Sequence, residues 1–245
     1  MLLALEHASK RFGSLKVIDD LSFSLAQGEA LGVLGPNGAG KSTMFNLITG
    51  DLRPESGRVL HKGEDITGLQ PSQRCRRGIG RSYQVPHPFG GMSVFENVLA
   101  GCVFGGALRA DAAHAHAVAV LERTGLITKA NTLAGSLTLL DRKRLEMARA
   151  LGTRPKLLLL DEIAGGLTDH EAHALVETIQ AIRAEGVSII WIEHVVHALL
   201  EVVDRLLVIN FGRLLKQGAP AEVMASREVR EVYMGIEADL AGAVE

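Results

Sequence analysis

Residues 35–43 read Gly35-Pro36-Asn37-Gly38-Ala39-Gly40-Lys41-Ser42-Thr43, and their spacing, G-x-x-x-x-G-K-S, is typical of a loop that binds nucleotide phosphates. The apolar residues 30–34 precede this loop and predict a buried strand, whereas residues 43–48 predict a helix that ends near Gly50. The glycines allow backbone N–H groups to point at phosphate oxygens, and the N-terminus of the helix adds positive potential. This stretch therefore predicts a strand, a phosphate-binding loop and a helix in succession.

Two polar side chains of the loop complete the expected site. Lys41 would place a positive charge on the outer phosphates, and Ser42 would offer its hydroxyl to Mg²⁺. A chance glycine-rich turn with this pattern is expected in about one chain in a hundred at average glycine usage. The flanking strand and helix lower those odds further, so we expect the chain to bind a nucleoside triphosphate.

Composition limits the class of protein. The 245 residues suffice for one large α/β domain, and the 47% of apolar residues suffice for a sizeable core. A net charge of −2 gives no general attraction to nucleic acid or to an anionic membrane, and the nine histidines show no metal-ligand spacing. Cys75 and Cys102 form no C-x-x-C pattern, which favours a reducing compartment. No apolar run reaches the roughly 20 residues of a membrane span, and no signal peptide is recognisable, so we expect a cytosolic protein.

The order of predicted elements indicates an α/β fold with an insertion. The first seventy residues are rich in strands, the part from about 85 to 150 is helical, and the last third alternates strands with helices. Parallel strands joined by helices predict a doubly wound, mainly parallel sheet that binds ligands at the carboxyl ends of its strands. Ser93 and Glu96 form a capping box that predicts the start of a helix. Further helices are predicted at 111–124, 142–151, 170–185 and 197–203. The predicted strands are 21–25, 58–61, 64–66, 157–160, 187–192, 206–209 and 213–216.

Polar residues at the ends of the late strands extend the expected site. Asp161 follows the leucines 157–160 and can hold Mg²⁺ through water, whereas the adjacent Glu162 can deprotonate an attacking water. Without a phosphate loop in the chain, a helix cap would be the better interpretation of these two acidic residues. The loop at residues 35–43 favours a role in the nucleotide site instead. His194 ends the next strand and could reach the γ-phosphate, although a lone histidine is more often structural. Gln84, at the start of the helical part, carries no signal by itself.

Taken together, these residues resemble the ATP-binding subunits of ABC transporters over nearly the whole chain. Phe12 stands where that family has an aromatic residue that stacks on adenine, and Gln84 matches the Q-loop glutamine, a further Mg²⁺ ligand. Residues 35–43 match Walker A, residues 157–162 match Walker B with its catalytic glutamate, and His194 matches the H-loop histidine. The resemblance implies an ABC ATPase fold: one P-loop NTPase domain over 1–245, with an N-terminal antiparallel β subdomain and a helical subdomain inserted at about 85–150.

Within that family the chain resembles the branch that takes up branched-chain and hydrophobic amino acids. Relatives that import urea or aromatic acids have similar motifs, so the sequence does not identify the transported solute. The resemblance rests on residues 81–89, 91–98, 192–194 and 232–235.

The chain departs from the family at the signature motif, which faces the ATP of the partner subunit. The aligned stretch, Leu137-Thr138-Leu139-Leu140-Asp141, keeps a hydroxyl at Thr138 but has Leu140 for a glycine and Asp141 for a glutamine. Thr168 also stands where the family's D-loop has an aspartate. Because Leu140 restricts close approach and Asp141 adds negative charge near an anionic ligand, we expect one weakened ATP site. A heterodimer of two ATPase subunits is therefore favoured over a homodimer.

The resemblance also implies the partners and the place of action. We expect Mg²⁺-dependent ATP hydrolysis that drives integral membrane permease subunits on the inner face of the cell membrane, with an extracytoplasmic solute-binding protein acting indirectly. The semi-apolar loop at the start of residues 84–98, which contains Phe89 and Met92, is expected to contact the permease unless it packs locally. A soluble ABC-type ATPase that acts on nucleic acid or ribosomes is the alternative, but the long coiled-coil insertion or second cassette usual there is missing. A GTPase is disfavoured because no N-K-x-D guanine reader is found.

Overall fold

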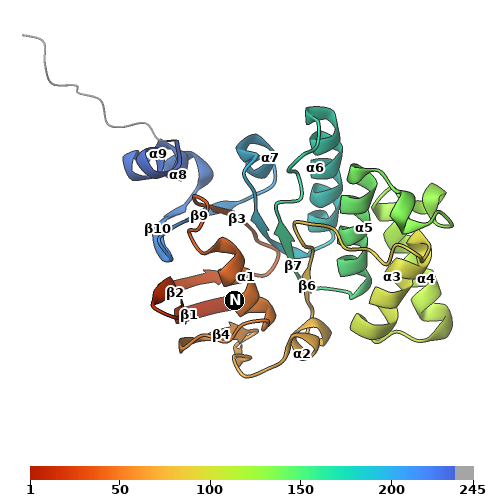
Figure 1. Cartoon of the computed structure of the whole chain (residues 1–245), viewed down its shortest axis with the longest axis horizontal. Helices are drawn as coiled ribbons and strands as arrows, with labels where there is room; N and C mark the ends of the chain where they lie inside the picture. The colour runs from red at the N-terminus through yellow and green to blue at the C-terminus, as the bar shows by residue number, and fades with distance from the viewer. Residues whose placement is uncertain (235–245) are drawn as a thin grey trace, which may run out of the picture.

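Two β-sheets and a block of helices make up the described part of the chain, residues 1–234, in the computed structural model (Figure 1). The N-terminal sheet is antiparallel and has the strand order β2-β1-β4-β5. It includes the predicted hairpin, whose turn places Lys62 and Gly63 at positive φ. The strands of this sheet are β1 (Leu3–Phe12), β2 (Leu15–Leu25), β4 (Ser56–His61) and β5 (Glu64–Asp65).

The second sheet carries the phosphate loop and is mainly parallel. Its six strands follow the order β10-β9-β3-β8-β7-β6, and only the closing hairpin of β9 and β10 is antiparallel. This arrangement confirms the predicted α/β class with a mainly parallel sheet. The strands are β3 (Ala30–Leu34), β6 (Ile79–Arg81), β7 (Leu157–Asp161), β8 (Ser188–Ile192), β9 (Arg205–Asn210) and β10 (Arg213–Gly218).

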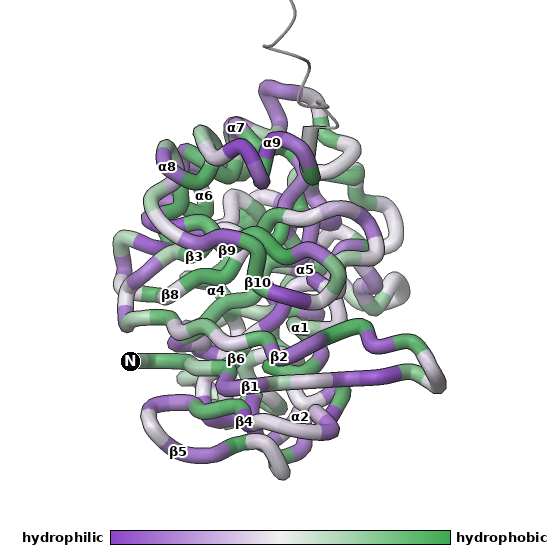
Figure 2. The backbone as a smooth tube through the Cα atoms, turned by 90° about the vertical axis from the view of Figure 1, so that its left-hand side faces the viewer, coloured by the Kyte–Doolittle hydropathy of each residue, from purple (hydrophilic) through white to green (hydrophobic). Residues whose placement is uncertain are grey.

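The parallel sheet separates two hydrophobic cores. In β7, Leu157 and Leu159 face the core shared with the antiparallel sheet and helix α1 (Lys41–Thr49), whereas Leu158 and Leu160 face the core shared with the helices. Successive side chains of a strand point to opposite faces, so a run of apolar residues indicates a strand covered on both sides. The central strands are accordingly coloured as hydrophobic in Figure 2, whereas α9 (Arg227–Met234) is largely hydrophilic.

The helical block lies to one side of the sheets, at the right of Figure 1, and is inserted in the chain between β6 and β7. Helices α3, α4 and α5 pack on one another, and Ser93 and Glu96 form the predicted capping box of α3. A π-helical turn, Gly101–Gly105, extends α3. The three helices are α3 (Val94–Ala100), α4 (Ala110–Arg123) and α5 (Leu139–Gly152).

Five further helices of the described residues lie outside the helical block. Among residues 1–234, no helix combines the length and the apolar composition that crossing a bilayer requires. The similarity noted over residues 232–235 lies partly outside the described residues, because Gly235 is not among them. These helices are α2 (Pro71–Arg76), α6 (Asp169–Ala184), α7 (Val196–Leu200), α8 (Pro220–Ala225) and α9.

Several boundaries differ from the sequence prediction. Helix α5 begins at Leu139 rather than at Arg142, because the hydroxyl of Thr138 accepts a hydrogen bond from the N–H of Asp141 and caps the helix. Helix α7 ends at Leu200, before Val203. Strands β1 and β6 and helix α2 are not among the predicted elements, since their short or mixed segments carry no clear periodicity. Helices α8 and α9 are not among the predicted elements either.

Candidate nucleotide site

A cleft of about 440 Å³ lies over the phosphate loop. The loop forms its floor, and three residues from distant parts of the sequence form its wall: Gln84, Glu162 and His194. These residues follow β6, β7 and β8, which are neighbours in the parallel sheet. Because the carboxyl ends of parallel strands meet at one edge, this strand order brings the three side chains together.

The loop backbone is shaped to surround an anion. Gly38 and Gly40 have φ of 80° and 103°, values that other residues rarely adopt. A Cβ atom at Gly40 would also lie only 2.7 Å from the carbonyl oxygen of Val17. Helix α1, which follows the loop, has no side-chain cap and no acidic residue in its first turn. Its N-terminal N–H groups are therefore free to bind phosphate.

The side chain of Lys41 is buried within the loop that it serves. Its Nζ donates to the carbonyl oxygens of Gly35, at 2.6 Å, and of Pro36, at 3.1 Å. Burial lowers the pKa of Lys41, and the nearby carboxylates of Glu162 and Asp161 oppose this shift. The ammonium is thus held at the cleft, where it can bind the outer phosphates of a nucleotide.

Glu162 is held from both sides by the other two wall residues. Nε2 of Gln84 donates to its Oε2 at 2.5 Å, and Nε2 of His194 lies 2.9 Å from its Oε1. Glu162 also has a positive φ of 47°, which is unusual for a residue with a side chain. A carboxylate with fixed orientation at the edge of a phosphate-binding cleft is suited to accept a proton from water.

Asp161 lies behind the cleft and is not part of its lining. Its Oδ2 accepts from Arg81 at 2.9 Å, whereas the buried Oδ1 has no hydrogen-bond partner. Burial raises the pKa of Asp161, and the bond from Arg81 acts in the opposite direction. An unpaired carboxylate oxygen, the exposed hydroxyl of Ser42 in the cleft and the amide oxygen of Gln84 are hard oxygen donors, so the predicted residues fit a hydrated Mg²⁺.

The structure adds Arg81, which the sequence reasoning did not single out. Its guanidinium lies between the rings of Phe45 and Tyr83, at 5.4 and 4.8 Å from their centroids. It also donates to Oδ1 of Asn46 on α1, at 2.6 Å. The only sequence signal is a charged residue three positions before Gln84.

Phe12, the predicted adenine-stacking residue, is not among the residues that line the cleft. It is half-exposed at the end of β1. Val17, on β2, lines the cleft instead. The remaining loop residues of the prediction, Pro36, Asn37, Ala39 and Thr43, lie in the loop and at the start of α1, and all but Pro36 are part of the lining.

The four signature residues lie at the start of α5 and do not line this cleft. Leu139 is half-exposed and lies close to Gly166, in the turn that follows Glu162. The structure corrects one expectation: the Asp141 carboxylate is not a free negative charge, because it is buried, pairs with Lys129 and accepts from the Thr138 hydroxyl at 2.9 Å.

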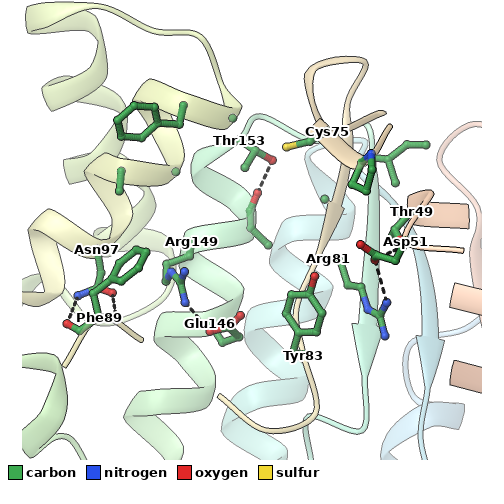
Figure 3. Close-up of a pocket in the computed structure, with 18 residues that line it drawn as sticks. Thr49, Asp51, Cys75, Arg81, Tyr83, Phe89, Asn97, Glu146, Arg149 and Thr153 are labelled. Carbon is green, nitrogen blue, oxygen red and sulfur yellow. Dashed lines mark hydrogen bonds and ion pairs between the residues drawn. The ribbon is translucent and has the colours of Figure 1, made fainter. Parts of the chain in front are cut away.

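A second cavity, of about 370 Å³, lies between the parallel sheet and the helical block (Figure 3). Phe89 and Arg149 lie on its helical side, with the guanidinium 4.8 Å from the centre of the ring. Arg81 and Tyr83 lie on its sheet side. Phe89, Tyr83 and Phe104 are each about half or more exposed, so this cavity has an accessible apolar lining.

Comparison with known proteins agrees with this geometry. The sequence model of the ABC transporter family matches residues 18–165. The high-affinity branched-chain amino acid transport ATP-binding protein LivG of Salmonella typhimurium is 35% identical, over 96% of this chain and 98% of LivG. The lipopolysaccharide export system ATP-binding protein LptB of Haemophilus influenzae is 32% identical, over 96% of this chain and 97% of LptB.

A solved structure shares both the fold and the sequence similarity. The ADP conformation of MJ1267, an ATP-binding cassette of an ABC transporter, superposes with a TM-score of 0.88 at 32% identity. The match covers 96% of this chain and 98% of that cassette. The similarity therefore extends through both sheets and the helical block.

Proposed function

This chain belongs to the ABC transporter family as an ATP-binding and ATP-hydrolysing subunit that works with membrane permease partners, and we propose that it drives the import of branched-chain or related amino acids. The observation that carries the amino-acid assignment is the 35% identity to LivG over nearly the full length of both chains. The similar identity to LptB makes export of a lipid the competing assignment, and the experiment below separates the two.

The proposed mechanism assigns each wall residue a task. The loop N–H groups and Lys41 bind the phosphates and orient the γ-phosphate. Glu162 accepts a proton from the attacking water at a carboxylate oxygen, and His194 and Gln84 keep that carboxylate in place. Water attack forms a bond to the γ-phosphorus while the bond to the β,γ-bridging oxygen breaks, which yields ADP and phosphate.

Mg²⁺ would be held by Ser42, by Gln84 and, through water, by Asp161. When bound, the ion neutralises charge on the β- and γ-phosphates. Arg81 prepares this place, because it fixes Oδ2 of Asp161 while the buried Oδ1 has no hydrogen-bond partner.

The second cavity is proposed to receive a segment of the permease. Its lining combines exposed aromatic rings with charged groups, which suits a short helix with an apolar side and polar ends. Phe89 lies in this lining rather than packed out of reach, in support of the expected contact of residues 84–98. The permease would thereby hold the chain at the inner face of the membrane.

A heterodimer with a second, different ATPase subunit is proposed for the functional pair. In the family arrangement, the N-terminus of α5 would face the partner's ATP. Here the Thr138 hydroxyl already caps α5 by accepting from the N–H of Asp141 and also donates to the Asp141 carboxylate, so it is engaged within the helix. Leu139 and Leu140 add bulk at the same place. This end of α5 is therefore poorly suited to bind a γ-phosphate, and a different partner would keep one site intact.

The test is transport by a reconstituted complex. The chain, its permease and its second ATPase would be placed in vesicles with ATP on the ATPase side and the solute-binding protein on the other side. We expect ATP-dependent uptake of radiolabelled leucine, isoleucine or valine, and no uptake with Lys41→Ala. ATP turnover stimulated by lipopolysaccharide but not by these amino acids would contradict the proposed import and favour lipid export.

A further inference from the structure

A buried carboxylate outside the nucleotide cleft joins the two catalytic turns. Glu193 is 1% exposed and immediately precedes His194. Its Oε2 accepts from the backbone N–H of Ala164, at 2.9 Å, in the turn that follows Glu162. Its Oε1 accepts from the N–H groups of His194, at 2.9 Å, and Val195, at 3.3 Å. One side chain thus ties the turn after β7 to the turn after β8.

A buried cation on α5 holds the same turn from the other side. Lys143 is 5% exposed, and its Nζ donates to the backbone carbonyl oxygen of Glu162 at 3.2 Å. The carboxylates of Glu193 and Glu162 attract this ammonium, whose pKa burial lowers. Neither Lys143 nor Glu193 lines the nucleotide cleft.

The backbone of Glu162 requires such support. A φ of 47° is unfavourable for a residue with a side chain, and this conformation persists only where the surroundings fix it. The N–H of Glu162 donates to the carbonyl oxygen of Ile192 at 2.8 Å, and its carbonyl oxygen accepts from Lys143. Both peptide groups of this residue are therefore anchored, one by strand β8 and one by helix α5.

Burying two opposite charges is unfavourable unless hydrogen bonds and mutual attraction compensate for the lost hydration. Lys and Glu are rarely this buried without a partner, because desolvation disfavours the charged form of each side chain. Here the two charges act on backbone groups that flank Glu162 and His194, whose side chains lie 2.9 Å apart. A change of either charge would move a turn that carries a catalytic side chain.

We propose that Lys143 and Glu193 are positioning residues that hold Glu162 and His194 in the arrangement needed for ATP hydrolysis. This inference rests on the proposed role of Glu162 as the general base. Because Lys143 belongs to α5, it also links this helix, which Thr138 caps, to the general base of this chain's own site. The positions of α5 and of Glu162 are thereby coupled.

The experiment compares single-turnover ATP hydrolysis and ATP affinity in the assembled complex. Lys143→Met and Glu193→Gln remove the charges and keep the approximate shapes. We expect each to slow hydrolysis on the order of 10-fold or more, with ATP affinity within about twofold of wild type. Lys143→Arg, which keeps the charge and a donor, should recover most of the lost rate.

A matched control distinguishes positioning from general stability. Arg183, on the last turn of α6, also donates to a backbone carbonyl, that of Val202, and pairs with a carboxylate, that of Asp204. This turn lies at the edge of the sheet opposite the cleft, because α6 runs back from the end of β7 to the start of β8. Arg183→Met should lower the melting temperature and leave the hydrolysis rate near wild type.

The results distinguish the positioning role of Lys143 and Glu193 from the proposed role of Glu162 as the general base. Wild-type rates in both Lys143→Met and Glu193→Gln, beside an inactive Glu162→Gln, would overturn the positioning inference alone. The same would follow if Lys143→Arg were as slow as Lys143→Met, or if the loss of rate matched a loss of ATP affinity. An active Glu162→Gln would instead refute the proposed role of Glu162, and the inference with it.

Discussion

Nε2 of His194 lies 2.9 Å from Oε1 of Glu162, although 32 residues separate them in the sequence. The contact exists because β7 and β8 are parallel neighbours whose carboxyl ends share one edge of the sheet. It places a candidate general base beside a group that can reach a bound γ-phosphate.

Lys41→Ala should weaken nucleotide binding itself. Among the described residues that line the cleft, Lys41 is the only lysine or arginine, so the substitution removes a charge-assisted contact to the phosphates. We expect ATP affinity to fall on the order of 10-fold or more, measured by titration of a fluorescent ATP analogue. Lys156→Ala, at an exposed position just before β7 and at the opposite end of that strand from Glu162, serves as the control and should bind normally. Equal affinities for wild type and Lys41→Ala would contradict the assignment.

Phe89→Asp should uncouple transport from hydrolysis. The ring is half-exposed in the second cavity, so a charge there would disturb permease docking more than folding. We expect basal ATPase activity of the isolated subunit to stay near wild type, while solute-stimulated activity in the complex is lost. Equal loss of both activities would show that Phe89 is needed for packing instead.

Arg81→Met should destabilise the protein strongly. The change leaves the buried carboxylate of Asp161 without its cation, and breaking a buried pair in this way costs about 3–5 kcal/mol. Urea unfolding measures the effect. Arg58→Met removes a comparable but exposed partner, that of Glu6, and should change stability little. Similar midpoints for the two variants would mean that the Arg81–Asp161 pair contributes no more than a surface pair.

The two ATP sites of the proposed heterodimer should differ in activity. This chain's own ATP would face an intact partner signature, whereas the partner's ATP would face the bulky, self-capped start of α5 at Thr138. Glu162→Gln should therefore abolish most turnover, while the equivalent change in the partner should leave much of it. The measurement is steady-state ATP hydrolysis by the whole complex carrying one change or the other. Equal losses of turnover from the two changes would refute the asymmetry of the sites.

Much of this site could be predicted from the sequence. The loop at 35–43 has a local pattern, and Asp161, Glu162 and His194 each follow a short apolar run that marks a buried strand. Such signals need no knowledge of the fold beyond the direction of the strands. The same is true of the capping box at Ser93.

The contacts behind the site could not be predicted in this way. Arg81 lies 80 residues before Asp161, and Glu193 lies 29 residues after Ala164. Their pairing depends on β6, β7 and β8 being adjacent, which is a property of the folded sheet and not of any local segment. The burial of Lys143 likewise depends on how α5 packs, since a lysine in a helix is ordinarily expected on the solvated face.

Single-turnover hydrolysis by the Glu162→Gln variant in the assembled complex tests most directly whether Glu162 is the general base. Glutamine keeps the shape of the side chain and can still contact Gln84 and His194, but it cannot accept the proton of the attacking water. We expect ATP binding to persist while hydrolysis slows on the order of 10²-fold or more. Hydrolysis near the wild-type rate would show that Glu162 is not the general base.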